Sequence, residues 1–187
     1  MKALVILFHA YADFEISHSL FLLRKVAKME IVTASVDGLP VTSIGGLKTT
    51  IDVSLENLNI KDYQLILIPG GDGIDNELLN NKWLIQQIQS AFQSRIPIAS
   101  ICASALMLGK AGILSGERFT CLPHTYNKYQ SLFESSDYTG QPIEVNNRII
   151  TAKGTAFAAF AIAALKLTGV DLTDQEWEKW RQFCMVT

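Results

Sequence analysis

The stretch Ile98-Ala99-Ser100-Ile101-Cys102-Ala103-Ser104-Ala105 is the most informative part of the sequence, because an apolar run ends in a cysteine and small residues follow at once. The apolar run is typical of a buried strand of a parallel sheet, and residues 103–111 continue as a helical pattern. Cys102 is therefore expected on a strand-to-helix elbow at the carboxyl edge of the sheet. There the N-terminus of the following helix would favour the thiolate. The alternative is a buried structural cysteine, since cysteine is among the most buried residue types.

The same alternation of apolar runs and helical patterns continues on both sides of this stretch. It predicts a single α/β domain over residues 1–187, with a mostly parallel sheet covered by helices. The predicted strands are residues 3–8, 29–35, 65–68 and 97–101, with hairpins at 41–50 (turning at Gly45-Gly46) and 143–151 (turning at Asn146-Asn147). The predicted helices are residues 14–27, 80–94 (Trp83, Leu84, Ile88 and Phe92 inward), 103–111, 155–168 and a last one opened by a capping box at Thr173–Glu176.

Length and charge narrow the classes of protein that need to be considered. A chain of 187 residues with 49% hydrophobic residues is long and apolar enough to form one globular domain. Sixteen Lys plus Arg against eighteen Asp plus Glu give a formal net charge of −2, which gives no reason to expect nucleic acid or an anionic membrane as a partner.

The cysteines and the apolar segments indicate a compartment. Three scattered cysteines (Cys102, Cys121 and Cys184) do not fit a disulfide framework or a metal cluster, and they favour a reducing environment. The apolar N-terminus is short and lacks a cleavage site, and no segment reaches the roughly 18 apolar residues of a membrane span. We therefore expect a cytoplasmic protein that holds no metal.

Two further segments, the loop of residues 69–73 and the segment that contains Glu15, follow predicted strands and could contribute to a site. The loop Pro69-Gly70-Gly71-Asp72-Gly73 follows the third strand, and its glycines would let backbone amides face a ligand. It lacks the features of a nucleotide-binding loop. Glu15, after the first strand, is either a helix-end charge or a site residue. Loops at the carboxyl ends of neighbouring strands share one crevice, so Glu15 and Cys102 would meet there if the first and fourth strands were adjacent.

Together these segments resemble the ThiJ/PfpI superfamily, which includes a parkinsonism-associated deglycase and the intracellular protease PfpI. The segments that carry the resemblance are Ala12-Asp13-Phe14-Glu15, Ile68-Pro69-Gly70-Gly71, Ala99-Ser100-Ile101-Cys102-Ala103, Ala111-Gly112-Ile113-Leu114-Ser115-Gly116 and Thr151-Ala152-Lys153-Gly154-Thr155. The resemblance extends through Gly169. It implies a flavodoxin-like three-layer sandwich with a nucleophile elbow, no cofactor and a homodimer. It also implies Cys102 as nucleophile, Glu15 as its protonated partner, and the amides of Gly71 and Ala103 as oxyanion donors.

The sequence departs from the family pattern in three places. Ala103 stands where protease-like members have a histidine, and Leu122 where the deglycase branch has one. Ser104 stands where glycine is common. His124 lies two residues after Leu122 and is either a substitute for that histidine or a residue of a surface loop. A catalytic triad is therefore not established by the sequence, and peptidase activity is disfavoured.

Three functions remain open at this point. The leading hypothesis is a cysteine-dependent enzyme that acts on small electrophilic carbonyl compounds, as a glutathione-independent glyoxalase or deglycase. The alternatives are a cysteine hydrolase of amides, peptides or isocyanides, and a non-enzymatic redox sensor or chaperone that responds to oxidative stress through Cys102. Cys121 is a structural residue or, if it passes near Cys102, a resolving thiol.

Overall fold

A central sheet of seven strands forms the middle layer of the protein. The computed structural model describes residues 1–146 and 148–184. Within them the strand order is β10-β11-β7-β6-β1-β2-β5, and all neighbours are parallel except β10 on β11. The strands are β1 (Lys2–Ile6), β2 (Glu30–Ser35), β5 (Val53–Ser54), β6 (Leu65–Ile68), β7 (Ile98–Ile101), β10 (Ile143–Asn146) and β11 (Ile149–Ala152). This mostly parallel sheet confirms the expected fold class.

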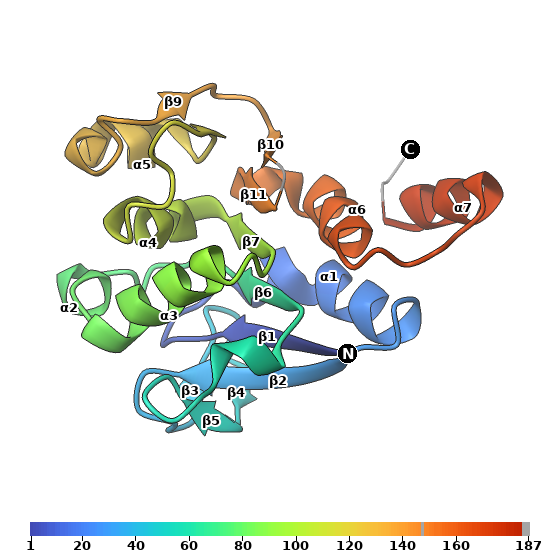
Figure 1. Ribbon diagram of the computed structural model, residues 1–187, viewed down its shortest axis with the longest axis horizontal. Coiled ribbons are helices and arrows are strands. Elements are labelled where there is room, and N and C mark those ends of the chain that lie inside the picture. Colours follow the sequence, from blue (N-terminus) through green and yellow to red (C-terminus); the bar gives the residue numbers. More distant parts are fainter. Residues whose placement is uncertain (147, 185–187) are drawn as a thin grey trace.

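Helices cover both faces of the sheet (Figure 1). Helices α1, α6 and α7 contact one another on one face, and α2, α3 and α4 on the other. Their bounds are α1 (Asp13–Lys25), α2 (Asn76–Leu79), α3 (Lys82–Gln93), α4 (Ala105–Lys110), α6 (Phe157–Leu167) and α7 (Asp174–Cys184). Short 3₁₀ helices are η1 (Ile60–Asp62), η2 (Cys102–Ser104), η3 (Gln130–Leu132) and η4 (Gly154–Ala156). None of the helices in the described ranges is both long and apolar enough to cross a membrane.

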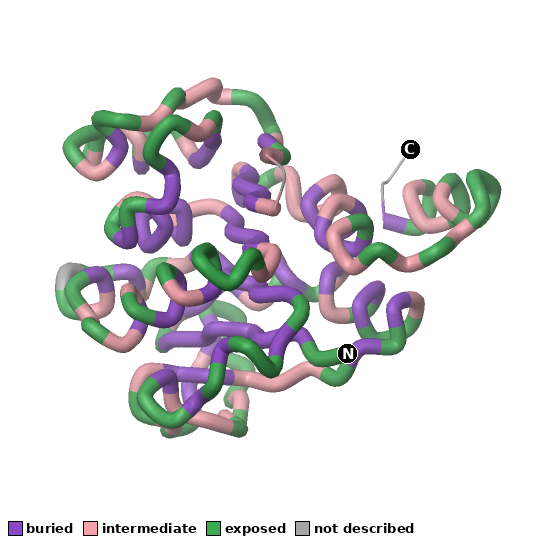
Figure 2. Tube along the Cα trace, viewed as in Figure 1, coloured by how far each residue is buried: buried purple, intermediate pink, exposed green. Residues whose placement is uncertain are grey.

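The core lies between these layers. Figure 2 shows that the central strands are buried over most of their length, whereas the outer helices alternate between buried and exposed residues. Every residue of β6, β7 and β11 is buried. A strand buried on both faces has no reason to alternate polar and apolar residues, which explains the continuous apolar runs of the sequence.

Several details of the sequence-based expectation need correction or completion. The first predicted hairpin forms as β3 (Val41–Thr42) and β4 (Lys48–Thr49). In the second, β10 pairs antiparallel with β11, and Asn147 of its turn lies outside the described residues. Phe92, expected inward, is 41% exposed. The helix expected from residue 103 begins as the 3₁₀ turn η2. The short elements β5, β8 (Arg118–Phe119), β9 (Asp137–Tyr138) and α5 (Pro123–Lys128) were not expected.

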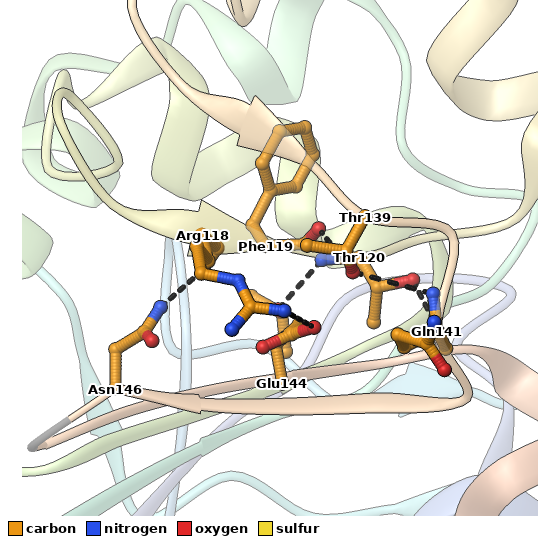
Figure 3. Close-up of polar contacts among 8 residues, drawn as sticks. Arg118, Phe119, Thr120, Thr139, Gln141, Glu144 and Asn146 are labelled. Atoms are coloured by element: carbon orange, nitrogen blue, oxygen red, sulfur yellow. Dashed lines mark hydrogen bonds and ion pairs between the residues drawn. The ribbon is translucent and has the colours of Figure 1, made fainter.

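The β8–β9 pair is attached to the edge of the sheet by a group of polar contacts (Figure 3). The Arg118 guanidinium forms an ion pair with the mostly buried Glu144 carboxylate of β10, at 3.2 Å. The Asn146 side chain donates a hydrogen bond to the Arg118 carbonyl. Next along the chain, the Thr120 amide donates to the Thr151 hydroxyl at 2.9 Å. These bonds fix the start of the segment that leads on to Cys121, Leu122 and α5.

Candidate active site

Cys102 follows β7 directly and adopts a backbone angle φ of 62°. This left-handed conformation is unusual for a residue other than glycine, and such strain persists where the surrounding structure enforces it. The residue is half-buried, and its side chain lies at the carboxyl edge of the sheet. The sequence-based prediction of a cysteine on a strand-to-helix elbow is thus met by the backbone geometry.

Glu15 lies in the first turn of α1, and its side chain is hydrogen-bonded to Cys102. The first and fourth predicted strands, β1 and β7, are not adjacent, because β6 runs between them. The two side chains meet across Gly70 of the intervening loop. A Cβ atom on Gly70 would lie 2.5 Å from the Cys102 Cβ and 2.8 Å from Glu15 Oε2. Only a glycine at this position leaves room for the contact.

The Glu15 carboxyl is held inside the protein. Its residue is 2% exposed, and its Oε2 accepts a hydrogen bond from the Gly70 amide at 2.7 Å. Burial raises the pKa of this carboxyl above its ordinary value, and the bonds from Cys102 and Gly70 lower it in part. A buried carboxyl in contact with a thiol is not the solvated helix-end charge that was the alternative for Glu15.

Burial and the neighbouring Glu15 carboxyl both change the pKa of the Cys102 thiol. Burial, followed by the charge of Glu15 and its hydrogen bond, raises the pKa of Cys102 to about 12. Two acidic groups in contact cannot readily both ionise, so the pair retains one proton over a wide range of pH. That proton resides on the oxygen or on the sulfur.

Two backbone amides favour negative charge on the sulfur. The amides of Ala103 and Gly154 bond to Cys102 and lower the pKa of its thiol. The family resemblance predicts the Ala103 amide as an oxyanion donor, and it assigns no role to Gly154. Gly154 follows β11, the parallel neighbour of β7, and a Cβ there would lie 2.5 Å from Glu15 Oε1 and 3.1 Å from Cys102 Sγ.

Gly71 lies at the opposite side of the pair, in the loop after β6. Its φ of 142° is one that side chains disfavour, and a Cβ would collide with the Ala10 carbonyl. A bridge pairs it with Tyr11. Gly71 lines the same cavity as Cys102 and Ala103, so the three residues expected around the reacting group do come together.

The cavity that contains Cys102 and Glu15 has a volume of about 560 Å³. Much of its wall is apolar and comes from Phe14, Ile44, Leu122 and Phe157. His124, exposed in the first turn of α5, also lines it. The described residues that line this cavity include no Lys or Arg. The space suits a small, uncharged molecule.

The remaining histidines and cysteines lie elsewhere. His9 is an exposed loop residue whose Nδ1 accepts a bond from the Thr42 amide, and His18 packs against Phe157 with ring centroids 5.4 Å apart. Cys121 is buried and its thiol contacts the Leu122 carbonyl at 3.5 Å; it is not among the residues lining the Cys102 cavity. Cys184 is buried in α7. Among the residues at described positions, no group of three His, Cys, Asp or Glu side chains could hold a metal ion.

Comparison with known proteins places this geometry in context. The sequence model of the DJ-1/PfpI family matches residues 1–167. The uncharacterized protease YdeA of Bacillus subtilis is 34% identical over 184 residues, which cover 95% of this chain and 88% of that protein. A deglycase of Pyrococcus abyssi is 27% identical over 123 residues, or 66% of this chain and 73% of that protein.

The fold of a solved relative agrees with the architecture described above. The crystal structure of a DJ-1 superfamily protein from Agrobacterium tumefaciens superposes with a TM-score of 0.83 at 29% identity. The superposition covers 98% of this chain and 97% of the other. The similarity therefore extends over the whole sheet and both helical layers.

Proposed function

Because the chain belongs to the DJ-1/PfpI family, we propose that it is a cysteine-dependent enzyme acting on small reactive carbonyl compounds, of the glyoxalase or deglycase type. The observation that carries the proposal is the hydrogen bond between the buried Glu15 carboxyl and the Cys102 thiol inside a cavity. A nucleophile and a proton carrier in direct contact are what addition to a carbonyl group requires.

The reaction begins with the proton of the pair on Glu15 and the negative charge on sulfur. The Cys102 thiolate attacks the aldehyde carbon, a carbon–sulfur bond forms, and the carbonyl electron pair moves to oxygen. The Ala103 amide, already directed at the sulfur, and the Gly71 amide stabilise that oxyanion. Protonation of the oxygen by Glu15 gives a hemithioacetal and leaves Glu15 as a carboxylate.

Glu15 then acts as a base. With methylglyoxal as substrate, it removes the proton from the former aldehyde carbon, and a proton is returned to the neighbouring carbon. The hydroxyl proton of the hemithioacetal passes to the neighbouring oxygen, so that the former aldehyde carbon becomes the carbonyl of the thioester. The product is a thioester of lactate on Cys102, and water hydrolyses it to lactate and the free thiol. Methylglyoxal and water are consumed and lactate is formed, so no external oxidant or reductant is needed.

The composition of the cavity favours neutral substrates. Its apolar wall and the absence of Lys and Arg among its described lining residues leave an anionic substrate without a cationic partner. The Cys102–Glu15 pair, which shares one proton and carries one negative charge, and the Asp72 side chain add negative charge beside that space. We therefore expect neutral dicarbonyl compounds to react better than anionic ones such as glyoxylate.

A hydrolase that uses the same thiol is the second candidate, and the protease name of the Bacillus subtilis relative favours it. Hydrolysis of an amide requires a general acid for the leaving nitrogen. Of the titratable side chains that line the described part of this cavity, Glu15 bonds to the thiol, and His124 is an exposed residue of its wall. Hydrolysis of amides, peptides or isocyanides is therefore a secondary reaction of the same site.

The proposal includes a homodimer in the cytoplasm. Phe21 and Phe183 stack on the surface of α1 and α7 with ring centroids 5.2 Å apart, and they are 40% and 60% exposed. Exposed aromatic clusters are common in interfaces between proteins. The three cysteines are free thiols, as suits a reducing compartment. The molar mass in solution tests the dimer.

The decisive assay follows the loss of methylglyoxal and the formation of lactate by the purified protein. We expect turnover by the wild type, less turnover of glyoxylate, and none by Cys102→Ser with either compound. A His124→Ala variant should retain activity, because His124 is not needed to form the thiolate. Absence of turnover together with ready peroxide oxidation of Cys102 would contradict the enzyme and favour the redox sensor.

A further inference from the structure

Ser104 is a completely buried polar residue in the turn between Cys102 and α4. Its hydroxyl is 2.7 Å from the Ile101 carbonyl and 3.0 Å from the Ile68 carbonyl. It accepts a bond from the Ile101 amide at 3.0 Å and lies 2.8 Å from the Ser100 hydroxyl. The side chain thus touches the residue that precedes Cys102 and the last residue of β6.

The bonding capacity of a hydroxyl limits how these contacts are shared. A serine has one hydrogen to donate and two lone pairs to accept with. The Ile101 amide fills one acceptor position, and we assign the Ser100 hydroxyl as the donor to the other, because the two nearby carbonyls compete for the hydrogen of Ser104. The single hydrogen goes to the nearer acceptor, the Ile101 carbonyl. Ser104 therefore supplies the hydrogen bond that this buried carbonyl needs.

The Ile101 carbonyl lies at the point where β6 and β7 stop pairing. The Ile66 amide bonds to the Pro97 carbonyl at 2.9 Å, and the register pairs Ile68 with Ser100. Parallel strands form such bonds at every second residue. Continued by two steps, the ladder would join the Gly70 amide to the Ile101 carbonyl.

In the structure both of these groups bond to side chains instead. The Ile101 carbonyl accepts a hydrogen bond from the Ser104 hydroxyl, and the Gly70 amide donates one to Glu15 Oε2 at 2.7 Å. We propose that Ser104 is a positioning residue, which occupies the Ile101 carbonyl so that the Gly70 amide remains available to hold Glu15 against Cys102. This inference rests on the proposed role of the Cys102–Glu15 pair.

Removal of the hydroxyl has a definite consequence. Without Ser104 Oγ, the Ile101 carbonyl is a buried acceptor that competes with Glu15 for the Gly70 amide. Extension of the ladder by one bond would draw that amide away from the carboxyl. Glu15 would then no longer be fixed beside the sulfur, and the proton carrier would be lost from the nucleophile.

The test measures the rate of Cys102 alkylation by iodoacetamide against pH in Ser104→Ala, Ser104→Gly and the wild type. We expect both variants to react more slowly near neutral pH by about fivefold, because the net free energy of one hydrogen bond corresponds to about that factor. Ser100→Ala is the matched control: it removes a hydroxyl that is equally buried and bonds to Ser104 but leaves the Ile101 carbonyl bond intact. It should keep the wild-type profile. Ser104→Gly serves if Ser104→Ala fails to fold.

The outcomes separate this inference from the proposed function. A lower melting temperature with an unchanged alkylation profile in both Ser104 variants would mean that the residue is only structural, and would overturn the inference alone. Equal slowing in Ser100→Ala would overturn it as well. A wild-type Cys102 that reacts no faster than free cysteine would overturn the proposed function and, with it, this inference.

Discussion

Single residues form the site partly by what they lack. Gly70 and Gly154 approach the Cys102–Glu15 pair from the two strands that flank β7, and neither has a side chain to separate the carboxyl from the thiol. Cys102 itself has a strained backbone. The two glycines and the strained Cys102 backbone together allow the carboxyl of Glu15 to contact the Cys102 thiol.

A methyl group at Gly154 should break that contact. In Gly154→Ala the Cβ would lie 2.5 Å from Glu15 Oε1, so the carboxyl must move and the Gly154 amide shifts away from the sulfur. We expect alkylation of Cys102 near neutral pH to slow by about tenfold, equivalent to about one unit in the pKa.

Gly112→Ala is the matched control for this substitution. Gly112 has a φ of 74° and open space where its Cβ would be, so the variant is strained but touches no site residue. It should lose stability and keep its alkylation rate. Equal effects of the two variants on alkylation would show that Gly154 acts through stability alone.

Secondary-structure elements bring these residues together from distant parts of the chain. Glu15 comes from the first turn of α1, Gly70 from the loop after β6, and Gly154 from the turn after β11. All three lie at the carboxyl edge of the sheet, where parallel strands place their following loops. These elements position the three site residues, whereas α7 packs against α6.

The capping box of α7 should affect stability without affecting the site. The Thr173 hydroxyl and amide bond to the Glu176 carboxylate, each at 2.9 Å, and the Glu176 amide bonds back to the hydroxyl. Thr173→Ala should lower the free energy of unfolding by about 1 kcal/mol. Denaturant titration measures this, with the exposed Thr50→Ala as a control. A loss of Cys102 reactivity in Thr173→Ala would contradict the separation of α7 from the site.

The elements also show how far the sequence could predict this protein. Apolar runs identified β1, β2, β6 and β7 because buried parallel strands need no alternation, and the capping box identified the start of α7. The two-residue strands β5, β8 and β9 are too short to leave a pattern. The position of β6 between β1 and β7 could not be predicted either, since the neighbours of a strand are set by tertiary pairing.

The site was predictable to a similar degree. Cys102 stood out because it ends an apolar run, and Glu15 because it follows one. The role of Gly154 was missed because it depends on β11 lying beside β7, which no local pattern reveals. The exposure of Phe92 was missed because the helical period alone does not say how wide the buried face of α3 is.

At the scale of the whole molecule, the fold keeps an acidic group in a place that disfavours its charge. Burial raises the pKa of Glu15 in the folded state. The neutral carboxyl is therefore favoured on folding, and the stability it gives is present below the ordinary pKa of about 4.3. That stability is lost as the pH rises through the folded value. At neutral pH the burial of Glu15 therefore lowers the stability of the folded state, and it also favours a proton next to the thiol.

The stability of Glu15→Gln should therefore depend less on pH than that of the wild type. Glutamine is neutral at every pH and can still accept a bond from the Gly70 amide. As the pH rises from about 5 through neutrality, we expect the free energy of unfolding of the variant to rise relative to the wild type, because burial raises the pKa of Glu15. Denaturant titrations across this range measure the difference, with the exposed Glu56→Gln as a control. A constant difference would show that Glu15 is ionised as readily in the folded chain as in the unfolded one.

The most direct test of the account is the rate of Cys102 alkylation as a function of pH in the wild type, Glu15→Gln and Glu15→Leu. Glutamine keeps a hydrogen-bond donor for the thiolate but cannot transfer a proton, so alkylation should survive while turnover collapses. An ionised Glu15 raises the pKa of Cys102, whereas a protonated Glu15 donates a hydrogen bond to the thiolate. Because the proposal places the proton on Glu15, leucine removes that donor, and its curve should shift to higher pH with slower alkylation near neutrality. Three superimposable curves would remove Glu15 from the site and leave Cys102 without its proposed partner.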